Sequence, residues 1–132
     1  AVIVDARSGA EYEGTDVRAL RGGHIPNAVN IDYARNFDPE LYRMLPLSQL
    51  KQLYKDIPAA TRVITHCQTG QRAAYSYLVL RALGYQDVAI YHDGWRVYGS
   101  NLDFPVDSET WFDFTKVNSM MKAVQELQSE ME

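Results

Sequence analysis

Short apolar runs alternate along this chain with longer stretches in which apolar residues recur at helical spacing. Four runs rich in β-branched residues predict strands, at residues 2–4, 29–31, 63–66 and 88–91. Two longer stretches predict helices, at residues 48–55 and 73–83, and Gly84 is the stop signal of the second. Because strands alternate with helices, we predict an α/β fold with a mostly parallel central sheet, helices on both of its faces and right-handed crossovers.

The segments between these elements carry weaker signals. Residues 8–14 predict a turn, a short helical stretch and a glycine stop, and residues 18–24 predict a loop around Gly22-Gly23. Residues 38–42 predict a single helical turn that starts at Asp38-Pro39.

Near the carboxyl end, apolar residues recur with the i, i+3, i+4, i+7 spacing of an amphipathic helix. They are Val117, Met120, Met121, Val124 and Leu127. We expect this helix to fold back on the core, and a dimer or interdomain surface is the alternative.

Length and composition are those of a single globular domain. The chain has 132 residues, of which 46% are apolar and 23% charged, and its formal net charge is -4. We expect one domain over residues 1–132, with a core at 2–106 and an extension at 107–132 that carries the amphipathic helix. The opening on a buried strand suggests a piece of a longer chain or a processed precursor. The sequence has no basic stretch that would bind nucleic acid, and it has no apolar run of the ~18 residues that a membrane span needs. We therefore expect neither nucleic acid nor a membrane as a partner.

Cys67 is the one cysteine of the chain. An internal disulfide is therefore excluded, and this favours a reducing, cytoplasmic compartment slightly over a periplasmic one. His24, His66 and His92 are widely spaced, and one cysteine supplies no pair of ligands, so we expect no metal and no cofactor.

The most informative stretch runs from Val63 to Gly84 and predicts a strand, a tight loop and a helix. Cys67 stands where the strand ends, and the loop leads directly into the amino end of the helix, where free N–H groups and the positive end of the helix dipole accumulate. These surroundings, together with the nearby Arg72, stabilise a thiolate, which is the reactive form of cysteine. Cys67 is therefore a candidate nucleophile, and a packed, inert sulfur is the alternative.

Polar residues follow three of the predicted strands, at residues 5–7, at Cys67 and at residues 93–95. Reactive groups of a parallel sheet gather beyond the carboxyl ends of its strands, so we expect these three loops to converge. Strand alternation points His66 away from Cys67, which predicts a structural role in the core. Trp95 is expected to pack over the rim of the site, with a place beside the substrate as the alternative, and His24 is expected to brace a turn.

Four motifs, in this order, resemble the rhodanese-like sulfurtransferase domain. They are Asp5-Ala6-Arg7 with Glu11-Tyr12 and Gly14, Gly23-His24-Ile25-Pro26-Asn27-Ala28-Val29-Asn30, Cys67-x-x-Gly70-x-Arg72, and Tyr91-x-Asp93-Gly94-Trp95. The match spans about residues 2–106. Residues 93–106 are also similar to the carboxyl-terminal, catalytic half of two-domain thiosulfate and mercaptopyruvate sulfurtransferases.

The resemblance implies transfer of a sulfane sulfur from a donor such as thiosulfate to a thiol or cyanide, through a persulfide on Cys67. The N–H groups of the loop can surround the outer sulfur of a persulfide as an oxyanion hole surrounds oxygen, and Gly70 allows the loop to close. Arg72 would offer a planar, permanently charged fork to an anionic donor. The expected substrate-binding residues are Gln68, Thr69, Gly70, Gln71, Arg72 and Arg7. For Arg7, an ion pair with Asp5 that braces the loops is the alternative.

The chain departs from the vertebrate-type enzymes of this family at two places. Those enzymes have a substrate-binding arginine where Glu11 stands here, and other loop residues where this chain has Gln68 and Thr69. Substrate preference is therefore open. We expect Glu11 to pair with Arg7 or Arg18 and to hold the wall of the site.

Two other functions remain open from the sequence. One is a sulfur carrier or regulatory rhodanese module that acts on a protein partner. The other is a cysteine-based phosphatase or arsenate reductase, in which a loop from cysteine to arginine holds a tetrahedral oxyanion. Phosphatase loops have five residues between the cysteine and the arginine, whereas Cys67 and Arg72 have four between them, and a loop shorter by up to ~3.5 Å of contour closes a tighter cradle.

Overall fold

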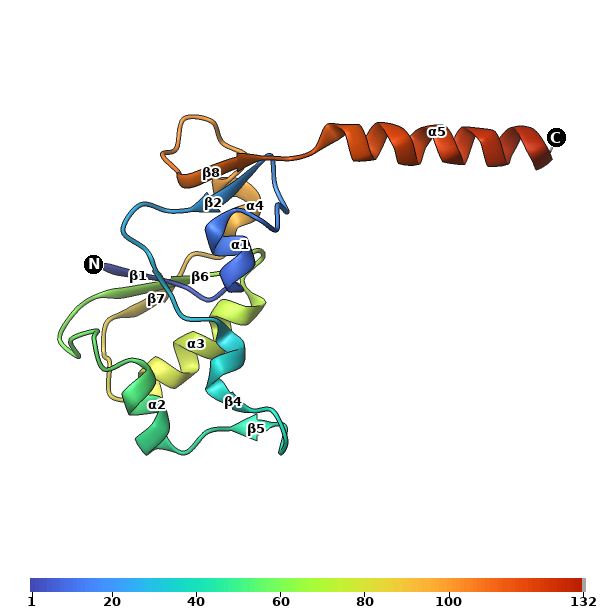
Figure 1. Cartoon of the computed structure of the whole chain (residues 1–132). Coiled ribbons are helices and arrows are strands. Elements are labelled where there is room, and N and C mark those ends of the chain that lie inside the picture. Colours follow the sequence, from blue (N-terminus) through green and yellow to red (C-terminus); the bar gives the residue numbers. More distant parts are fainter. Residues whose placement is uncertain (132) are drawn as a thin grey trace.

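A computed structural model describes residues 1–131 of the chain. Four parallel strands form the central sheet in the order β3-β1-β6-β7 (Figure 1). They are β1 (Val2–Asp5), β3 (Val29–Asn30), β6 (Val63–His66) and β7 (Val88–Ile90). The predicted α/β fold and its parallel sheet are thus confirmed, and the register sets Asp5 opposite His66 where β1 and β6 end.

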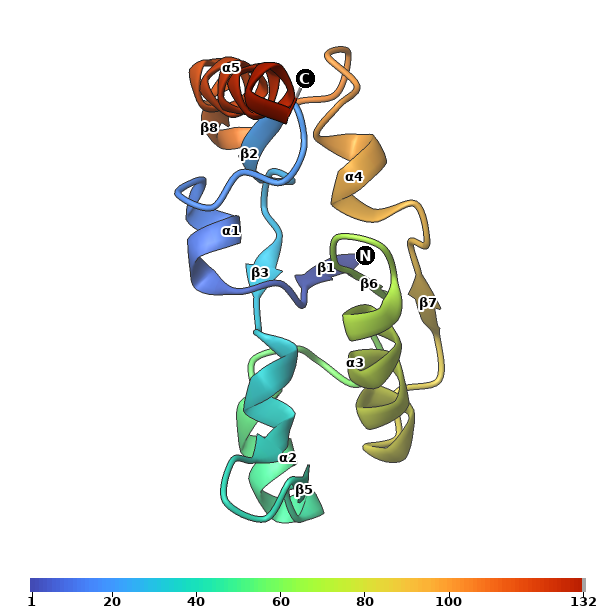
Figure 2. The same ribbon diagram turned by 90° about the vertical axis from the view of Figure 1, so that its right-hand side faces the viewer.

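Helices cover both faces of this sheet. Helices α2 (Leu47–Leu53) and α3 (Gln71–Ala82) lie below it in Figures 1 and 2. Above it lie the short helices α1 (Gly9–Glu13) and α4 (Gly94–Tyr98), together with a small antiparallel sheet of β2 (Arg21–His24) and β8 (Asp107–Trp111).

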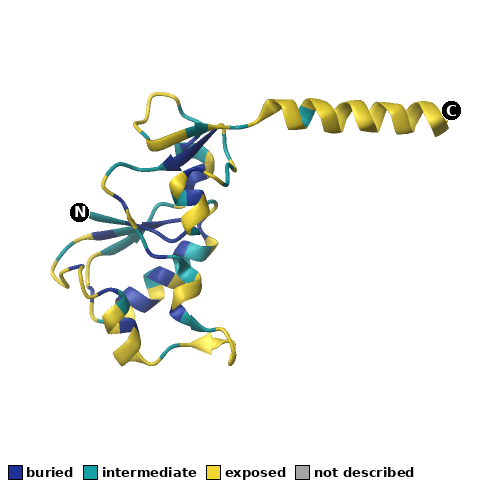
Figure 3. Ribbon diagram, in the orientation of Figure 1, coloured by how far each residue is buried: buried dark blue, intermediate teal, exposed yellow. Residues whose placement is uncertain are grey.

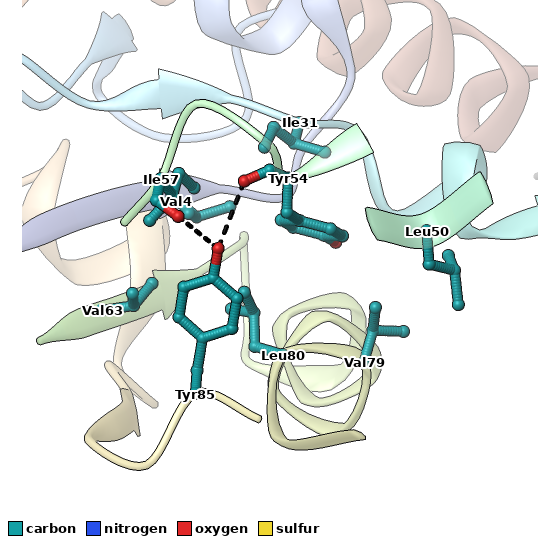
Figure 4. Packing of buried hydrophobic residues seen from close by; sticks show 9 residues of the cluster. All are labelled: Val4, Ile31, Leu50, Tyr54, Ile57, Val63, Val79, Leu80 and Tyr85. Atoms are coloured by element: carbon teal, nitrogen blue, oxygen red, sulfur yellow. Dashed lines mark hydrogen bonds between the residues drawn. The ribbon is translucent and has the colours of Figure 1, made fainter. Parts of the chain in front are cut away.

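The main hydrophobic core fills the space between the sheet and the lower helices (Figure 4). Strand alternation turns Val4 and Val63 to this face, where they meet residues of α2, α3 and the loops that follow these helices. The remaining members of the cluster are Ile31, Leu50, Tyr54, Ile57, Val79, Leu80 and Tyr85. The Tyr85 hydroxyl lies in hydrogen-bond reach of the carbonyls of Ile57 and Tyr54, so its polar end is satisfied inside the core.

The loop predicted for residues 18–24 is partly wrong, because Arg21–His24 forms strand β2. Its partner β8 lies more than 80 residues further along the chain, so the pairing cannot be predicted from a local sequence pattern. Glycine is rare in strands, so the propensities of Gly22 and Gly23 did not predict a strand here. Here they allow a close approach of β8: a Cβ on Gly22 would collide with the side chain of Thr110.

The helical turn predicted for residues 38–42 is present, since the N–H of Tyr42 donates to the carbonyl of Asp38 at 2.9 Å, but it closes a hairpin that the sequence did not predict. The hairpin lies between β4 (Phe37–Asp38) and β5 (Arg43–Met44). The Asp38 side chain accepts hydrogen bonds from the N–H groups of Glu40 and Leu41, which satisfies them in a turn instead of a helix. A one-turn 3-10 helix, η1 (Tyr33–Asn36), precedes the hairpin.

The terminal helix α5 (Phe114–Met131) is amphipathic as predicted, but it does not fold back on the core. It begins directly after β8 and extends away from the rest of the molecule (Figures 1 and 3). None of its 18 residues is buried. Within residues 1–131, every helix is too short or too polar to cross a membrane.

Candidate active site

Cys67 follows β6 directly and lies at the base of the loop that leads into α3. Its side chain packs with Ala6 and Ala73, and only 1% of the residue is exposed. The Sγ atom is not in a purely apolar environment, because the N–H of Gly70 donates a hydrogen bond to it at 3.0 Å. A main-chain donor of the loop is therefore aimed directly at the sulfur.

Two carbonyl groups of the loop, those of Cys67 and Gln68, point to α4. The N–H of Trp95 donates to the carbonyl of Cys67 at 2.8 Å, and the N–H of Arg96 donates to the carbonyl of Gln68 at 3.2 Å. Across a trans peptide, the carbonyl of one residue and the N–H of the next point in opposite directions. The N–H groups of Gln68 and Thr69 therefore point away from α4, which leaves them free to stabilise a negative charge on the other side of the loop.

Two glycines make this arrangement sterically accessible. Gly94 has a φ of 62°, and a Cβ at this position would lie 2.6 Å from the carbonyl oxygen of Cys67 and 2.5 Å from that of Gln68. Gly70 has a φ of 101° and is the residue at which the loop turns into α3. Both positions are in the left-handed region that glycine adopts most easily.

Arg72 forms the opposite wall of the loop through a two-pronged ion pair with Glu11. Its Nη1 and Nη2 atoms lie 2.7 and 3.0 Å from the two carboxylate oxygens of Glu11. The sequence predicted Arg7 or Arg18 as the partner of Glu11. The Arg7 prediction is wrong, and Arg18 reaches Glu11 only at 3.8 Å.

Helix α1 positions Glu11 for this contact. Ser8 caps the helix, and its hydroxyl accepts a hydrogen bond from the N–H of Glu11 at 3.2 Å. The Glu11 carboxylate in turn accepts one from the N–H of Ser8, which completes a capping box. The Ser8-x-x-Glu11 spacing was visible in the sequence, but the contact with Arg72 was not.

The ion pair sets the charge state of both groups. Burial raises the pKa of Glu11, but the hydrogen bond and the charge of Arg72 outweigh it, so the net pKa is lowered. The hydrogen bond that Arg72 donates to the Glu11 carboxylate raises the pKa of Arg72. Both groups are therefore charged at neutral pH. The neighbouring Arg18 pairs with Asp16, with 2.9 Å between its Nη2 atom and the carboxylate, so these two residues add no net charge to the rim of the site.

Arg7 lies beneath the site and is 1% exposed. Its Nη2 atom donates to Asp5 at 2.6 Å and to the carbonyl of Gly23 at 2.7 Å, and its guanidinium lies 4.4 Å from the centre of the Trp95 ring. This geometry matches the alternative of a structural brace, and it leaves Arg7 poorly placed to bind a substrate. Trp95 is fully buried and donates to the carbonyl of Arg21, so its predicted place at the rim is wrong.

His66 is fully buried on the far side of Cys67, as strand alternation predicted. Its Nε2 atom lies 3.5 Å from Asp5 and has no hydrogen-bond partner among the described residues. Burial lowers the pKa of His66, and the nearby Asp5 carboxylate only partly opposes this. His24 stacks on Tyr12 with ring centres 3.7 Å apart and bonds its carbonyl, which is consistent with the predicted brace.

The other predicted loop residues differ in exposure. Thr69 and Gln71 are exposed, whereas Gln68 is half-buried and its amide donates to the carbonyl of Arg18 at 2.8 Å. Residues 67–70 form the loop, and together with the first residues of α3 they lie close to Glu11 and Arg18. Among residues 1–131, no group of three or more histidine, cysteine or carboxylate side chains is arranged to hold a metal ion.

The fold and the site define an α/β domain with one cysteine at the carboxyl edge of a parallel sheet, enclosed by a loop that ends in arginine. The chain belongs to the rhodanese-like domain family, which matches residues 1–101. The predicted family is thereby confirmed.

Curated relatives include two bacterial thiosulfate sulfurtransferases. That of Pseudomonas aeruginosa is 40% identical over 108 residues, which cover 80% of this chain and 39% of that protein. That of Corynebacterium glutamicum is 32% identical over 115 residues, covering 80% and 38%. The chain therefore spans less than half the length of these relatives.

Two solved structures share the fold. EanB, solved with a cysteine persulfide and ergothioneine, is 18% identical with a TM-score of 0.73, and the match covers 81% of this chain and 28% of that one. Tum1 of Saccharomyces cerevisiae is 24% identical with a TM-score of 0.69, covering 83% and 40%.

Proposed function

We propose that this chain is the catalytic unit of a sulfurtransferase, which carries a sulfane sulfur as a persulfide on Cys67. The observation that carries the proposal is the hydrogen bond from the N–H of Gly70 to Sγ of Cys67, at the base of a loop whose next donors also point away from α4. Membership of the family and the sulfurtransferase activity in the names of its relatives support it.

In the first half-reaction the Cys67 thiolate attacks the outer sulfur of a donor such as thiosulfate. A bond forms between Sγ and that sulfur, the sulfur–sulfur bond of the donor breaks, and sulfite leaves with the electron pair. The new persulfide extends the side chain by about 2 Å, the length of a sulfur–sulfur bond. Its outer sulfur then meets the N–H groups of residues 68–72, which stabilise the negative charge on it.

In the second half-reaction an acceptor attacks the outer sulfur. A thiolate takes it away as a new persulfide, and cyanide takes it away as thiocyanate. In both cases the electron pair of the broken bond returns to Cys67, which regenerates its thiolate. No oxidant is consumed, and no general base is required if the acceptor arrives ionised.

Access to the sulfur requires the loop side chains to move, since Cys67 is 1% exposed. The side chains that can move aside are those of Thr69 and Gln71, which are exposed, and that of Gln68, which is half-buried. We propose these three, with Gly70 and Arg72, as the residues that contact the donor. Arg7 is left out, because its donors are engaged beneath the site.

The structure argues against a phosphatase or arsenate reductase. In such enzymes the arginine of the loop binds the oxyanion, and its fork must be free. Here both prongs of Arg72 face the buried carboxylate of Glu11, at 2.7 and 3.0 Å. A phosphatase needs this fork on the phosphoryl oxygens, whereas a persulfide on Cys67 needs only main-chain N–H groups around its outer sulfur.

The test is mass spectrometry of the intact protein and of its peptides after treatment with thiosulfate. We expect one added sulfur atom on the Cys67 peptide, sulfite in equal amount, and loss of the sulfur on treatment with a thiol or cyanide. Cys67→Ser is the matched control and should stay unmodified. An unmodified Cys67 would refute the proposal, and a persulfide that discharges to one protein only would replace it with the carrier function.

A further inference from the structure

Helix α5 exposes an apolar stripe along its whole length. Between 53% and 86% of Met120, Met121, Val124, Leu127 and Met131 is exposed. The helix is about 27 Å long at 1.5 Å per residue, and Figure 1 shows it extending away from the body. Most of the stability of a helix in a protein comes from packing of its apolar face, so this exposed stripe points to a partner surface.

The spacing of the stripe is that of a coiled-coil seam. Val117, Met120, Val124, Leu127 and Met131 follow one another at intervals of 3, 4, 3 and 4 residues. We propose that α5 pairs with α5 of a second copy of this chain, in antiparallel orientation. This inference is independent of the proposed sulfur transfer.

Charge complementarity selects the antiparallel orientation. Lys116 and Glu130 flank the seam on the same side, one near each end of the helix. When Val117 packs against Leu127 of the second copy, Lys116 of each copy faces Glu130 of the other, which gives two ion pairs. A parallel pair would instead place Lys116 beside the apolar Met121 of the second copy.

The base of α5 supplies a second argument for this orientation. A groove of about 580 Å³ lies between residues 14–17, residues 110–113 and the first turns of α5, and Val117 and Met120 line it. In the antiparallel pair, Leu127 and Met131 of the second copy lie over this groove. The end of one helix thus covers the apolar surface at the start of the other. In a parallel pair the start of the second α5, which follows directly on its own β8, would lie here instead and bring the two domains to the same end of the pair.

Charge reversal tests the proposal directly. We expect the wild-type chain to dimerise in sedimentation equilibrium, and Lys116→Glu and Glu130→Lys each to weaken the dimer about tenfold, because each change turns two attractive pairs into repulsive ones. The double variant should recover the wild-type affinity. Lys122→Glu, which reverses a charge on the outer face of the same helix, is the control and should have little effect. A monomeric wild-type chain, or single variants that dimerise normally, would overturn the proposal.

Cross-linking distinguishes the two orientations in the Cys67→Ser background, where an introduced cysteine is the sole thiol. In the antiparallel pair the two copies of Met121 flank the twofold axis on one side, so Met121→Cys should be cross-linked by a short bismaleimide. Lys122→Cys, on the outer face, should not be. Equal yields from the two variants would contradict the antiparallel pairing.

Discussion

The guanidinium of Arg72 and the carboxylate of Glu11 meet through two hydrogen bonds of 2.7 and 3.0 Å. Sequence reasoning assigned the fork of Arg72 to an anionic sulfur donor. In the structure the fork is occupied by a carboxylate of the chain itself, which is 1% exposed. An anionic donor that approaches Arg72 therefore meets an ion pair instead of a free cation, and the carboxylate should weaken the binding of such a donor.

Glu11→Gln should strengthen the binding of anionic donors. The change keeps the capping box of α1, because glutamine serves equally at that position, but it removes the negative charge beside Arg72. We expect the KM for thiosulfate to fall about fivefold, the equivalent of ~1 kcal/mol, while the KM for an uncharged persulfide donor stays the same. Steady-state kinetics with both donors is the measurement. Glu13→Gln, an exposed residue on the same helix, is the control, and equal effects of the two variants would contradict the assignment.

Arg7→Met should destabilise the domain without changing donor binding. It removes the partner of the buried Asp5 carboxylate and the cation above Trp95, and breaking a buried pair typically costs about 3–5 kcal/mol. Urea denaturation measures this loss. Arg18→Met, at a half-exposed ion pair, should change stability by less than about 1 kcal/mol. If Arg7→Met instead raised the KM for thiosulfate at unchanged stability, Arg7 would be the substrate ligand predicted from the sequence.

Gly94→Ala should impair catalysis through the loop. Its Cβ would lie 2.5 Å from the carbonyl of Gln68, so α4 and the loop must move apart and the donors around Cys67 shift. We expect the rate of persulfide formation to fall about tenfold to a hundredfold.

Gly84→Ala is the matched control for that substitution. Gly84 also has a left-handed φ, of 97°, but a Cβ there would have no neighbour within 4 Å. It should cost about 1–2 kcal/mol of stability through backbone strain and leave persulfide formation unchanged. Similar rates for the two alanine variants in a stopped-flow assay of sulfite release would speak against a role for the α4 contact.

Stability should fall on acidification in two separate steps. The pKa of His66 is lowered by burial, so below its ordinary value of 6.5 the unfolded chain binds a proton that the folded chain does not, and stability decreases as the pH falls. The pKa of Glu11 is lowered from 4.5, so its contribution is complete above that value and is lost only at more acidic pH. Urea titrations at a series of pH values measure both steps. His66→Gln should remove the first step and Glu11→Gln the second, and a variant that keeps its step would refute the assignment to that residue.

Local patterns predicted the elements that hold the site. Runs of β-branched residues identified β1, β6 and β7 because a strand between two layers of helices must be apolar on both faces. The position of Cys67 between β6 and α3 followed from the same pattern. Strand β2 was not predicted, because its glycines are poor strand formers that are favoured here by close packing against β8. The hairpin of β4 and β5 was not predicted, because the hydrogen bonds of the Asp38 side chain resemble those at the start of a helix.

The fold class, the family and the place of the thiol could all be predicted, since these depend on periodicities and short motifs that neighbouring residues carry. The pairing of the charged side chains could not be predicted in the same way. Glu11 and Arg72 are 61 residues apart, and Arg7 could equally have faced the substrate or the core. A side chain's partner depends on where distant segments lie in space, and the same holds for α5, whose pattern predicts an apolar face but not the surface that covers it.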